Sequence, residues 1–344
     1  MNITDYHIEM LDVGAADAFI VWLETSDCGN RLILIDSGNY SNGDVIVDHI
    51  RNYYTDHPYI DLAIVSHCDD DHYGGFVRLL EKIKDHDSDQ IMIGEFWIND
   101  PSAHDIDTGD VKYVRKQQTV NNRLRSVYSL SSGKNLLDLI KQLKIKRTEK
   151  FAKSEQLSWL QTSLQHSDDS LYDCFTIIGP TRRNYESLIL EMRNDLEAVT
   201  EGVSVTSFSQ HEMPSFDDIE DDSSAHNRSS MIILFEALGN KYLFTGDAAR
   251  ESFYKILKSK IKLINRVDWL KVPHHGSDHN LNTELIRYIK PKVAYVSAKE
   301  IPAKRKPNVI SCLKNNGCVV VATFNNGNLL LNGDRDGYVP AKTL

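Results

Sequence analysis

The chain opens with short apolar runs that are separated by turn residues. Runs of this kind predict β-strands, and the clearest are YHIEMLDV (6–13), AFIVWLE (18–24), RLILIDSG (31–38) and LAIVS (62–66). The last run has no polar alternation, which is typical of a strand covered on both faces. After Gly75 the apolar residues recur at helical spacing, so we expect a helix there.

The pattern becomes polar and mostly helical between about 100 and 225. We predict that this range is largely an insertion, with a basic helical part at 110–153 and an acidic loop at 213–224, although CFTIIGP (174–180) resembles a strand. Strand patterns then resume. MIILFEA and KYLFTGD flank a hairpin turn signal, and CVVVATF with NLLLNG predicts a closing hairpin.

These elements predict one α/β domain over residues 1–344. Its expected architecture is an αββα sandwich, in which two mixed sheets lie face to face with helices outside. The 344 residues are 41% hydrophobic, which is enough for a large core. No apolar run approaches the roughly 20 residues that span a membrane, so we expect a cytoplasmic protein without a membrane segment.

Charge and cysteine content limit the classes of binding partner and metal site that the chain can have. The net charge is −10, so the surface as a whole does not attract polyanions, although the 112–153 segment is basic. That segment is read either as a nucleic-acid groove, as a protein interface or as a solvated face. The five cysteines are scattered without a CxxC pair, which argues against a disulfide framework and against a thiolate zinc site.

Polar residues gather where predicted strands end. The stretch HCDDDH follows the strand at 62–66, FTGD ends in Asp247, and WLKVPHHGS ends a strand with two adjacent histidines. Imidazole and carboxylate together form the ligand set for zinc, manganese or iron, and metal ions would neutralise the crowded acids. The alternative for HCDDDH is an acidic turn that caps the following helix, but capping requires no histidines.

Together these motifs resemble the metallo-β-lactamase superfamily. The resemblance rests on His-x-Asp-x-Asp-His followed by Gly74 and Gly75, on FTGD, and on LKVPHHGS. It is strongest for the hydrolase domain of bacterial DNA-uptake channels and its soluble relatives, which include phosphorylcholine esterases. MLDVGAADAFIV and LILIDSG match the first strands of that group. The resemblance covers roughly residues 6–80 and 226–331.

The resemblance implies a centre of two divalent metal ions, zinc or manganese. The implied ligands are His67 and Asp69 on one ion, Asp71 and His72 on the other, Asp247 between them, and either His274 or His275 on the second ion. Asp71 and Asp247 are the expected catalytic residues, together with Lys306 in the place of a substrate-contacting histidine. The residues expected to support the ligands or to contact substrate are Asp12, Asp17, Asp36, Asn227 and Ser277.

Two departures from the wider superfamily affect the metal preference. Asp69 stands where histidine is more common, and Asn227 stands near another usual histidine, although His226 is adjacent and competes for that role. Oxygen ligands favour manganese more than imidazole does, so we expect zinc to copurify and manganese to support faster hydrolysis. Cys68, between two implied ligands, is expected to point away from the metals.

This chemistry predicts a metal-dependent hydrolase, a phosphodiesterase or nuclease that uses a metal-bridging hydroxide. Its substrate would be a phosphodiester, with nucleic acid held by the basic segment. His226, His279 and Lys306 are candidates for the general acid. The alternatives are a small-molecule esterase of the phosphorylcholine-esterase type, with an acidic loop attracting a cationic head group, and a metal-stabilised scaffold subunit whose insertion binds a protein partner.

Overall fold

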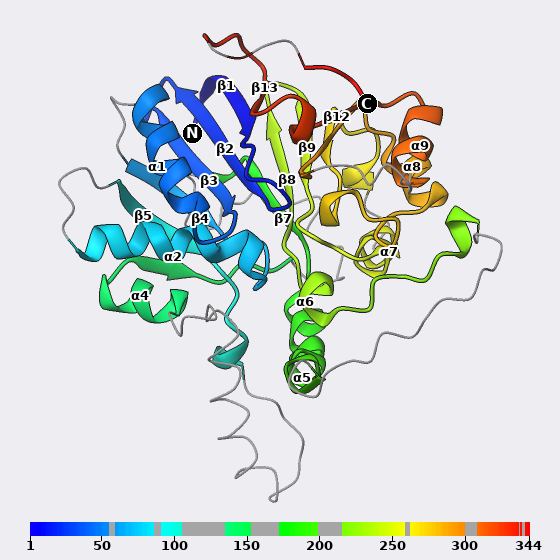
Figure 1. Ribbon diagram of the computed structural model, residues 1–344, viewed down its shortest axis with the longest axis horizontal. Helices are drawn as coiled ribbons and strands as arrows, with labels where there is room; N and C mark the ends of the chain where they lie inside the picture. The colour runs from blue at the N-terminus through cyan, green and yellow to red at the C-terminus, as the bar shows by residue number, and fades with distance from the viewer. Residues whose placement is uncertain are drawn as a thin grey trace, which may run out of the picture.

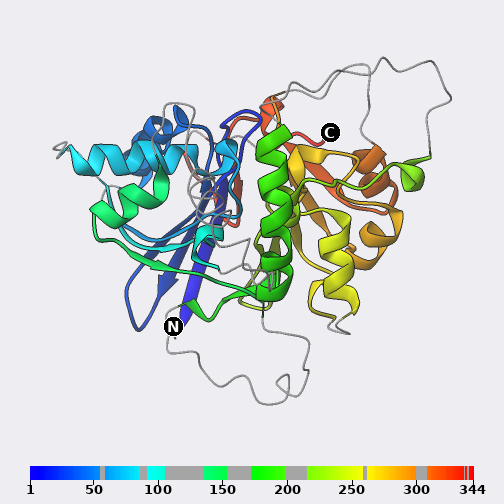
Figure 2. The same ribbon diagram turned by 90° about the horizontal axis from the view of Figure 1, so that it is seen from below.

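The computed structural model describes residues 1–54, 59–85, 91–104, 135–152, 172–198, 215–258, 262–299, 308–336, 338 and 341–344. Within these residues the chain forms two mixed β-sheets that pack face to face, with helices on the outer side of each (Figures 1 and 2). The predicted α/β sandwich is therefore confirmed.

The first sheet is formed mainly by the N-terminal half. Its order is β13-β1-β2-β3-β4-β5-β6, antiparallel from β13 to β3 and parallel from β3 to β6. The strands are β1 (Ile3–Met10), β2 (Ala18–Thr25), β3 (Arg31–Ser37), β4 (Tyr59–Ile64), β5 (Met92–Trp97), β6 (Lys146–Thr148) and β13 (Leu329–Leu331). All residues of β4 after Tyr59 are buried, as the unbroken apolar run predicts.

The second sheet is formed by the C-terminal half and has the order β12-β11-β10-β9-β8-β7. The strands are β7 (Phe175–Gly179), β8 (Ile232–Ala237), β9 (Asn240–Phe244), β10 (Trp269–Lys271), β11 (Val293–Val296) and β12 (Val319–Ala322). The predicted hairpin between β8 and β9 is confirmed. The closing hairpin is wrong, because β12 pairs with β11 whereas β13 crosses to β1 in the other sheet.

Aromatic and aliphatic side chains from both sheets fill the space between them. Phe19 of β2, for example, packs edge to face against Phe244 of β9 and Trp269 of β10. The outer face of the first sheet is covered by α1 (Asn42–Tyr53), α2 (Asp70–Lys84) and α4 (Leu136–Gln142), and that of the second by α7 (Arg250–Lys258), α8 (Thr283–Ile289) and α9 (Asn308–Asn315). These clusters bury most of the predicted apolar runs.

The range 100–225, expected to be largely insertion, also contributes to both sheets. β6 extends the first sheet beside β5, and β7 forms an edge of the second sheet beside β8. The helix α5 (Arg182–Ala198) packs against the core of the first half and lies next to α6 (Ala225–Arg228) (Figure 1). Residues 105–134, 153–171 and 199–214, which hold most of the predicted basic part, lie outside the described residues.

The motif HCDDDH (67–72) runs from the segment after β4 into the first turn of a helix. α2 begins at Asp70, six residues before the apolar helical pattern starts at Phe76, so Asp71 and His72 belong to its first turn. The two glycines allow α2 to approach the loop after β3: a Cβ on Gly74 would lie 2.6 Å from the backbone nitrogen of Tyr40, and one on Gly75 2.1 Å from a backbone oxygen. Larger residues at both positions would push the helix away from the sheet.

The C-terminal segment connects the two sheets. Thr343 forms a bridge with Val321 of β12, whereas Arg335 reaches the buried carboxylate of Glu9 in β1. Glu9 also accepts hydrogen bonds from Tyr54 and Tyr338 and lies 2.7 Å from His49 Nε2. Burial by itself would raise the pKa of Glu9, but these partners outweigh it and lower the pKa to about 2.

This pKa predicts a specific acid sensitivity. A carboxyl whose folded-state pKa is depressed stabilises the fold above its ordinary pKa of 4.5, and this contribution is lost as the pH falls toward about 2. Glu9→Gln should therefore be less stable than the wild type at neutral pH, and the difference should narrow between about pH 4.5 and 2. Urea unfolding of both proteins over a pH series measures this. A difference that does not change with pH would contradict the role given to Glu9.

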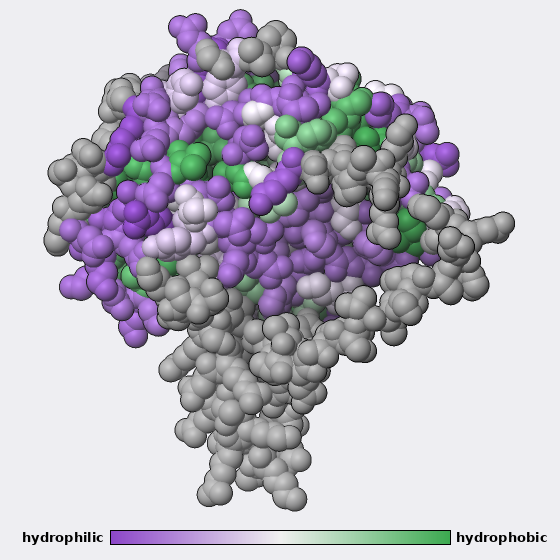
Figure 3. All heavy atoms as spheres, in the orientation of Figure 1, coloured by the Kyte–Doolittle hydropathy of each residue, from purple (hydrophilic) through white to green (hydrophobic). Residues whose placement is uncertain are grey.

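In the described part of the chain, no helix combines the length and the hydropathy needed to cross a membrane. Hydrophilic residues cover most of the centre of the face in Figure 3, and apolar residues form small separate patches there.

Candidate metal centre

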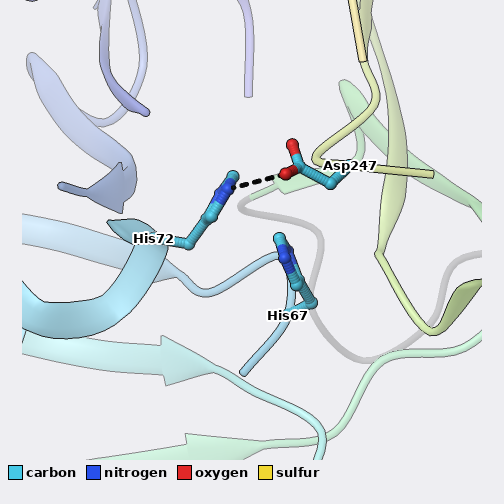
Figure 4. Close-up of side chains that lie close together, drawn as sticks. All are labelled: His67, His72 and Asp247. Atoms are coloured by element: carbon cyan, nitrogen blue, oxygen red, sulfur yellow. Dashed lines mark ion pairs between the residues drawn. The ribbon is translucent and has the colours of Figure 1, made fainter. Parts of the chain in front are cut away.

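The ends of three strands bring the predicted ligands together. His67 follows β4, Asp247 follows β9 and His275 follows β10, while Asp71 and His72 extend from the first turn of α2. Figure 4 shows His67 and His72, from the first half of the chain, beside Asp247 from the second. The cluster therefore spans the junction between the two sheets.

Two overlapping groups of donor atoms form this cluster. The ligand atoms of His67, His72 and Asp247 lie within 4.8 Å of one another, and so do those of Asp71, His72 and His275. Nε2 of His72 is 3.4 Å from Oδ2 of Asp247, and Nε2 of His275 is 3.1 Å from Oδ2 of Asp71. His72 thus belongs to both groups.

Two buried nitrogen atoms in this cluster have no hydrogen-bond partner. They are Nε2 of His67 and Nε2 of His72, whose side chains are fully buried. The other ring nitrogen of His72 is 2.8 Å from Oδ2 of Asp36, which in turn accepts a hydrogen bond from Ser66 Oγ at 2.7 Å. A histidine held through Nδ1 by a carboxylate, with Nε2 left free, is the usual arrangement around a bound metal. The residues therefore fit a metal ion.

Asp69 lies between two histidines. Its Oδ2 is 3.4 Å from Nε2 of His67, and its Oδ1 is 2.8 Å from Nδ1 of His226 in α6. Asp69 occupies the N-cap position of α2 but makes no capping hydrogen bond with its side chain, so helix capping does not explain this carboxylate. Burial by itself would raise the pKa of Asp69, but the two histidines outweigh it and lower the pKa well below its usual range.

This arrangement distinguishes His226 from Asn227 and corrects the expected direction of Cys68. Asn227 does not reach Asp69; its side chain donates to Asp222 at 2.7 Å, so His226 is the residue of this pair that joins the cluster. Cys68 is buried but does not point away, because its sulfur lies within 4.8 Å of ligand atoms of Asp69 and His226. The surroundings of Asp69 are therefore less rich in oxygen atoms than the sequence alone indicates.

The adjacent histidines 274 and 275 have different surroundings. Nε2 of His275 faces Asp71, and its Nδ1 is 2.9 Å from Ser297 Oγ. Nδ1 of His274 instead lies 3.0 Å from Oδ2 of Asp222, away from the cluster. Both residues have positive φ values, 48° and 51°, in the left-handed region that non-glycine residues rarely adopt. This tight turn directs the two neighbouring side chains to different sides.

Asp247 divides its two oxygens between the protein and the cluster. Oδ1 lies 3.1 Å from Nζ of Lys271 and accepts a hydrogen bond of 3.1 Å from the backbone nitrogen of His274, whereas Oδ2 faces His72 and His275. Burial by itself would raise the pKa of Asp247, but Lys271 and the two histidine rings outweigh it and lower it well below its usual range.

Lys271 is a residue that sequence reasoning missed. It is 1% exposed in the short strand β10, and its Nζ lies 2.5 Å from Oδ2 of Asp17. Burial by itself would lower the pKa of Lys271, but Asp17 and Asp247 outweigh it and raise the pKa. A lysine inside the apolar run WLKV was the available signal, because a buried lysine needs a carboxylate partner.

The remaining predicted residues are distributed as follows. Asp17 and Asp36 are buried beside the cluster, and Asp17 accepts a hydrogen bond from Ser297. The backbone nitrogen of Asp12 donates to the side chain of Asn328, and Ser277 Oγ accepts from the backbone nitrogen of His279. Ring atom Nδ1 of His279 lies 2.9 Å from the carbonyl of Glu220. Lys306 lies outside the described residues.

The fold and the site define an α/β sandwich protein with a buried histidine–carboxylate cluster between its two halves. No family model matches the chain. The chain is similar to the ComE operon protein 3 of Bacillus subtilis (strain 168), with 29% identity over 110 residues, which are 31% of this chain and 14% of that protein. A long form RNase Z from yeast aligns with 94% of this chain and 41% of its own, at 12% identity and a TM-score of 0.39. Both matches span less than half of the other protein.

Proposed function

We propose that the protein is a metal-dependent hydrolase of the metallo-β-lactamase type that cleaves phosphodiesters with two metal ions. The observation that carries the proposal is the pair of overlapping donor groups, in which Nε2 of His67 and of His72 are buried without a hydrogen-bond partner next to Asp247. Burying such atoms is costly unless a further partner is present, and a divalent cation satisfies imidazole and carboxylate together.

The proposed ligands divide into two sets, and Asp247 lies near a histidine of each, His67 and His275. His67, Asp69 and His226 would hold one ion, and Asp71, His72 and His275 would hold the other. Two divalent ions, zinc or manganese, would supply there an activated water nucleophile near neutral pH and stabilisation of charge on a phosphoryl oxygen. Donors of both nitrogen and oxygen type suit either ion.

The chain's own residues orient these ligands. Asp36 holds the ring of His72, and Ser297, which donates to Asp17, holds the ring of His275. These contacts occupy Nδ1 in both rings, so each ring presents Nε2 toward the cluster. Fixed ring orientations reduce the reorganisation that binding and catalysis require.

The described contacts of the acidic loop give limited support to a phosphodiester over a cationic head group. Three acidic side chains of the loop have partners within the protein: Asp217 accepts from the backbone of Thr283, Asp221 from that of Arg250, and Asp222 contacts His274 and Asn227. Carboxylates with such partners attract a ligand less strongly than free ones. Binding of nucleic acid by the basic segment 112–153 is part of the proposal.

Metal loading tests the proposal directly. We expect the chelator-stripped protein to be inactive and to regain hydrolysis of bis-p-nitrophenyl phosphate when about two equivalents of zinc or manganese are restored, since both ions contribute to the reaction. Mass spectrometry of the metal content, together with assays on DNA, RNA and cyclic dinucleotides, measures stoichiometry and substrate class. Full activity in the stripped protein, or no more than one bound ion at saturation, would contradict the two-metal mechanism.

A further inference from the structure

Lys271 places its ammonium group in contact with the cluster. Five carboxylates gather at or beside the proposed metal positions, namely Asp17, Asp36, Asp69, Asp71 and Asp247. Among the described residues, the ion pairs of these carboxylates with lysine or arginine are those that Lys271 forms with Asp17 and Asp247. The ammonium group also donates a hydrogen bond of 2.7 Å to the carbonyl of Gly246.

Lys271 divides the carboxylate oxygens into those that contact its ammonium group and those that face the histidines of the cluster. Asp17 is completely buried, and its ligand atom lies in a further group of possible donors with Asp36 and His72. Lys271 contacts Oδ2 of Asp17 and Oδ1 of Asp247, so these oxygens face a cation that the chain already supplies. Oδ2 of Asp247 remains turned toward His72 and His275.

We propose that Lys271 is a built-in cation of the metal centre, which keeps Asp17 and one oxygen of Asp247 from binding metal and thereby limits the centre's affinity for hard divalent ions. This inference rests on the proposed function. Opposite charges attract strongly when water is excluded, so a buried carboxylate that loses its ammonium partner becomes a strong site for another cation. Oxygen ligands attract ions such as manganese.

The test is manganese binding by Lys271→Met, which removes the charge while keeping a long apolar side chain. We expect this variant to bind Mn²⁺ at least about tenfold more tightly than the wild type, because one buried negative charge is no longer balanced. Isothermal titration of chelator-stripped protein with Mn²⁺ measures this without any substrate. Lys292→Met is the matched control: Lys292 immediately precedes β11 and pairs with Asp268 at 2.6 Å, so its loss should leave Mn²⁺ binding unchanged.

A double variant keeps the test valid if Lys271→Met does not fold. Lys271→Met with Asp17→Asn removes the ammonium and one carboxylate together, so the net charge of the site is unchanged and Mn²⁺ affinity should return to that of the wild type. Equal or weaker binding by a folded Lys271→Met, or lost binding in the double variant, overturns the role of Lys271. Absence of Mn²⁺ binding by the wild type would instead overturn the metal centre, and this inference with it.

Discussion

Asp71→Asn should remove nearly all phosphodiester hydrolysis while leaving the fold intact. Asp71 is partly exposed at the edge of the cluster, where its Oδ2 is 3.1 Å from Nε2 of His275. The amide keeps the shape but loses the negative charge that a metal ligand needs. Lewis-acid stabilisation is worth several kcal/mol, so a loss of about 4 kcal/mol corresponds to at least about a thousandfold in kcat/KM.

The neighbouring residue provides a matched control for this experiment. Asp70→Asn makes the same chemical change one position earlier in α2, where the side chain is exposed and accepts a hydrogen bond from Tyr73. This variant should retain the wild-type kcat/KM. Metal content and circular dichroism of both variants separate a lost ion from a lost fold, and an Asp71→Asn protein with full turnover would show that the site is misassigned.

Among single substitutions in the C-terminal segment, we expect Arg335→Ala to lower the free energy of unfolding the most. The guanidinium lies 4.8 Å from the ring centres of Tyr53 and Tyr54 and donates to Glu9, whose side chain has no exposed surface. Removing one partner of a buried charge costs about 3–5 kcal/mol, and because Glu9 keeps hydrogen bonds from two tyrosines we expect about 3 kcal/mol.

Urea unfolding of Arg335→Ala against Arg287→Ala measures this effect. Arg287 is an exposed residue of α8, so its loss should change the free energy of unfolding by no more than about 0.5 kcal/mol. Equal, small effects in the two variants would mean that Arg335 contributes no more than a surface ion pair does. The attachment of the C-terminal segment would then rest on its other contacts, such as the hydrogen bond from Tyr338 to Glu9.

The sequence predicted most of the secondary structure but missed some pairings. Unbroken apolar runs identified β2, β3 and β4 because burial on both faces is a local property of a strand. The same reasoning failed for β13, which is adjacent in sequence to β12 but pairs with β1. Strand pairing depends on the arrangement of whole sheets, and the pattern within a short segment does not record it.

The candidate site shows the same division. HCDDDH, Asp247 and the histidine pair could be selected from sequence because each follows a strand and carries ligand chemistry that burial alone does not explain. The sequence did not distinguish His274 from His275, since both occupy one turn. The left-handed backbone at both positions determines which histidine faces the cluster, because it turns His275 toward Asp71 and His274 toward Asp222.

What the sequence determined by itself is therefore the set of elements and the types of donor groups, because periodicity, strand ends and side-chain chemistry are local. What only the tertiary structure decided is which distant groups meet. Asp69 Oδ1 lies 2.8 Å from Nδ1 of His226, and Lys271 contacts Asp17, only because the two sheets pack face to face. Side chains far apart in the chain acquire their partners, and the energy of those contacts, from packing that no single segment encodes.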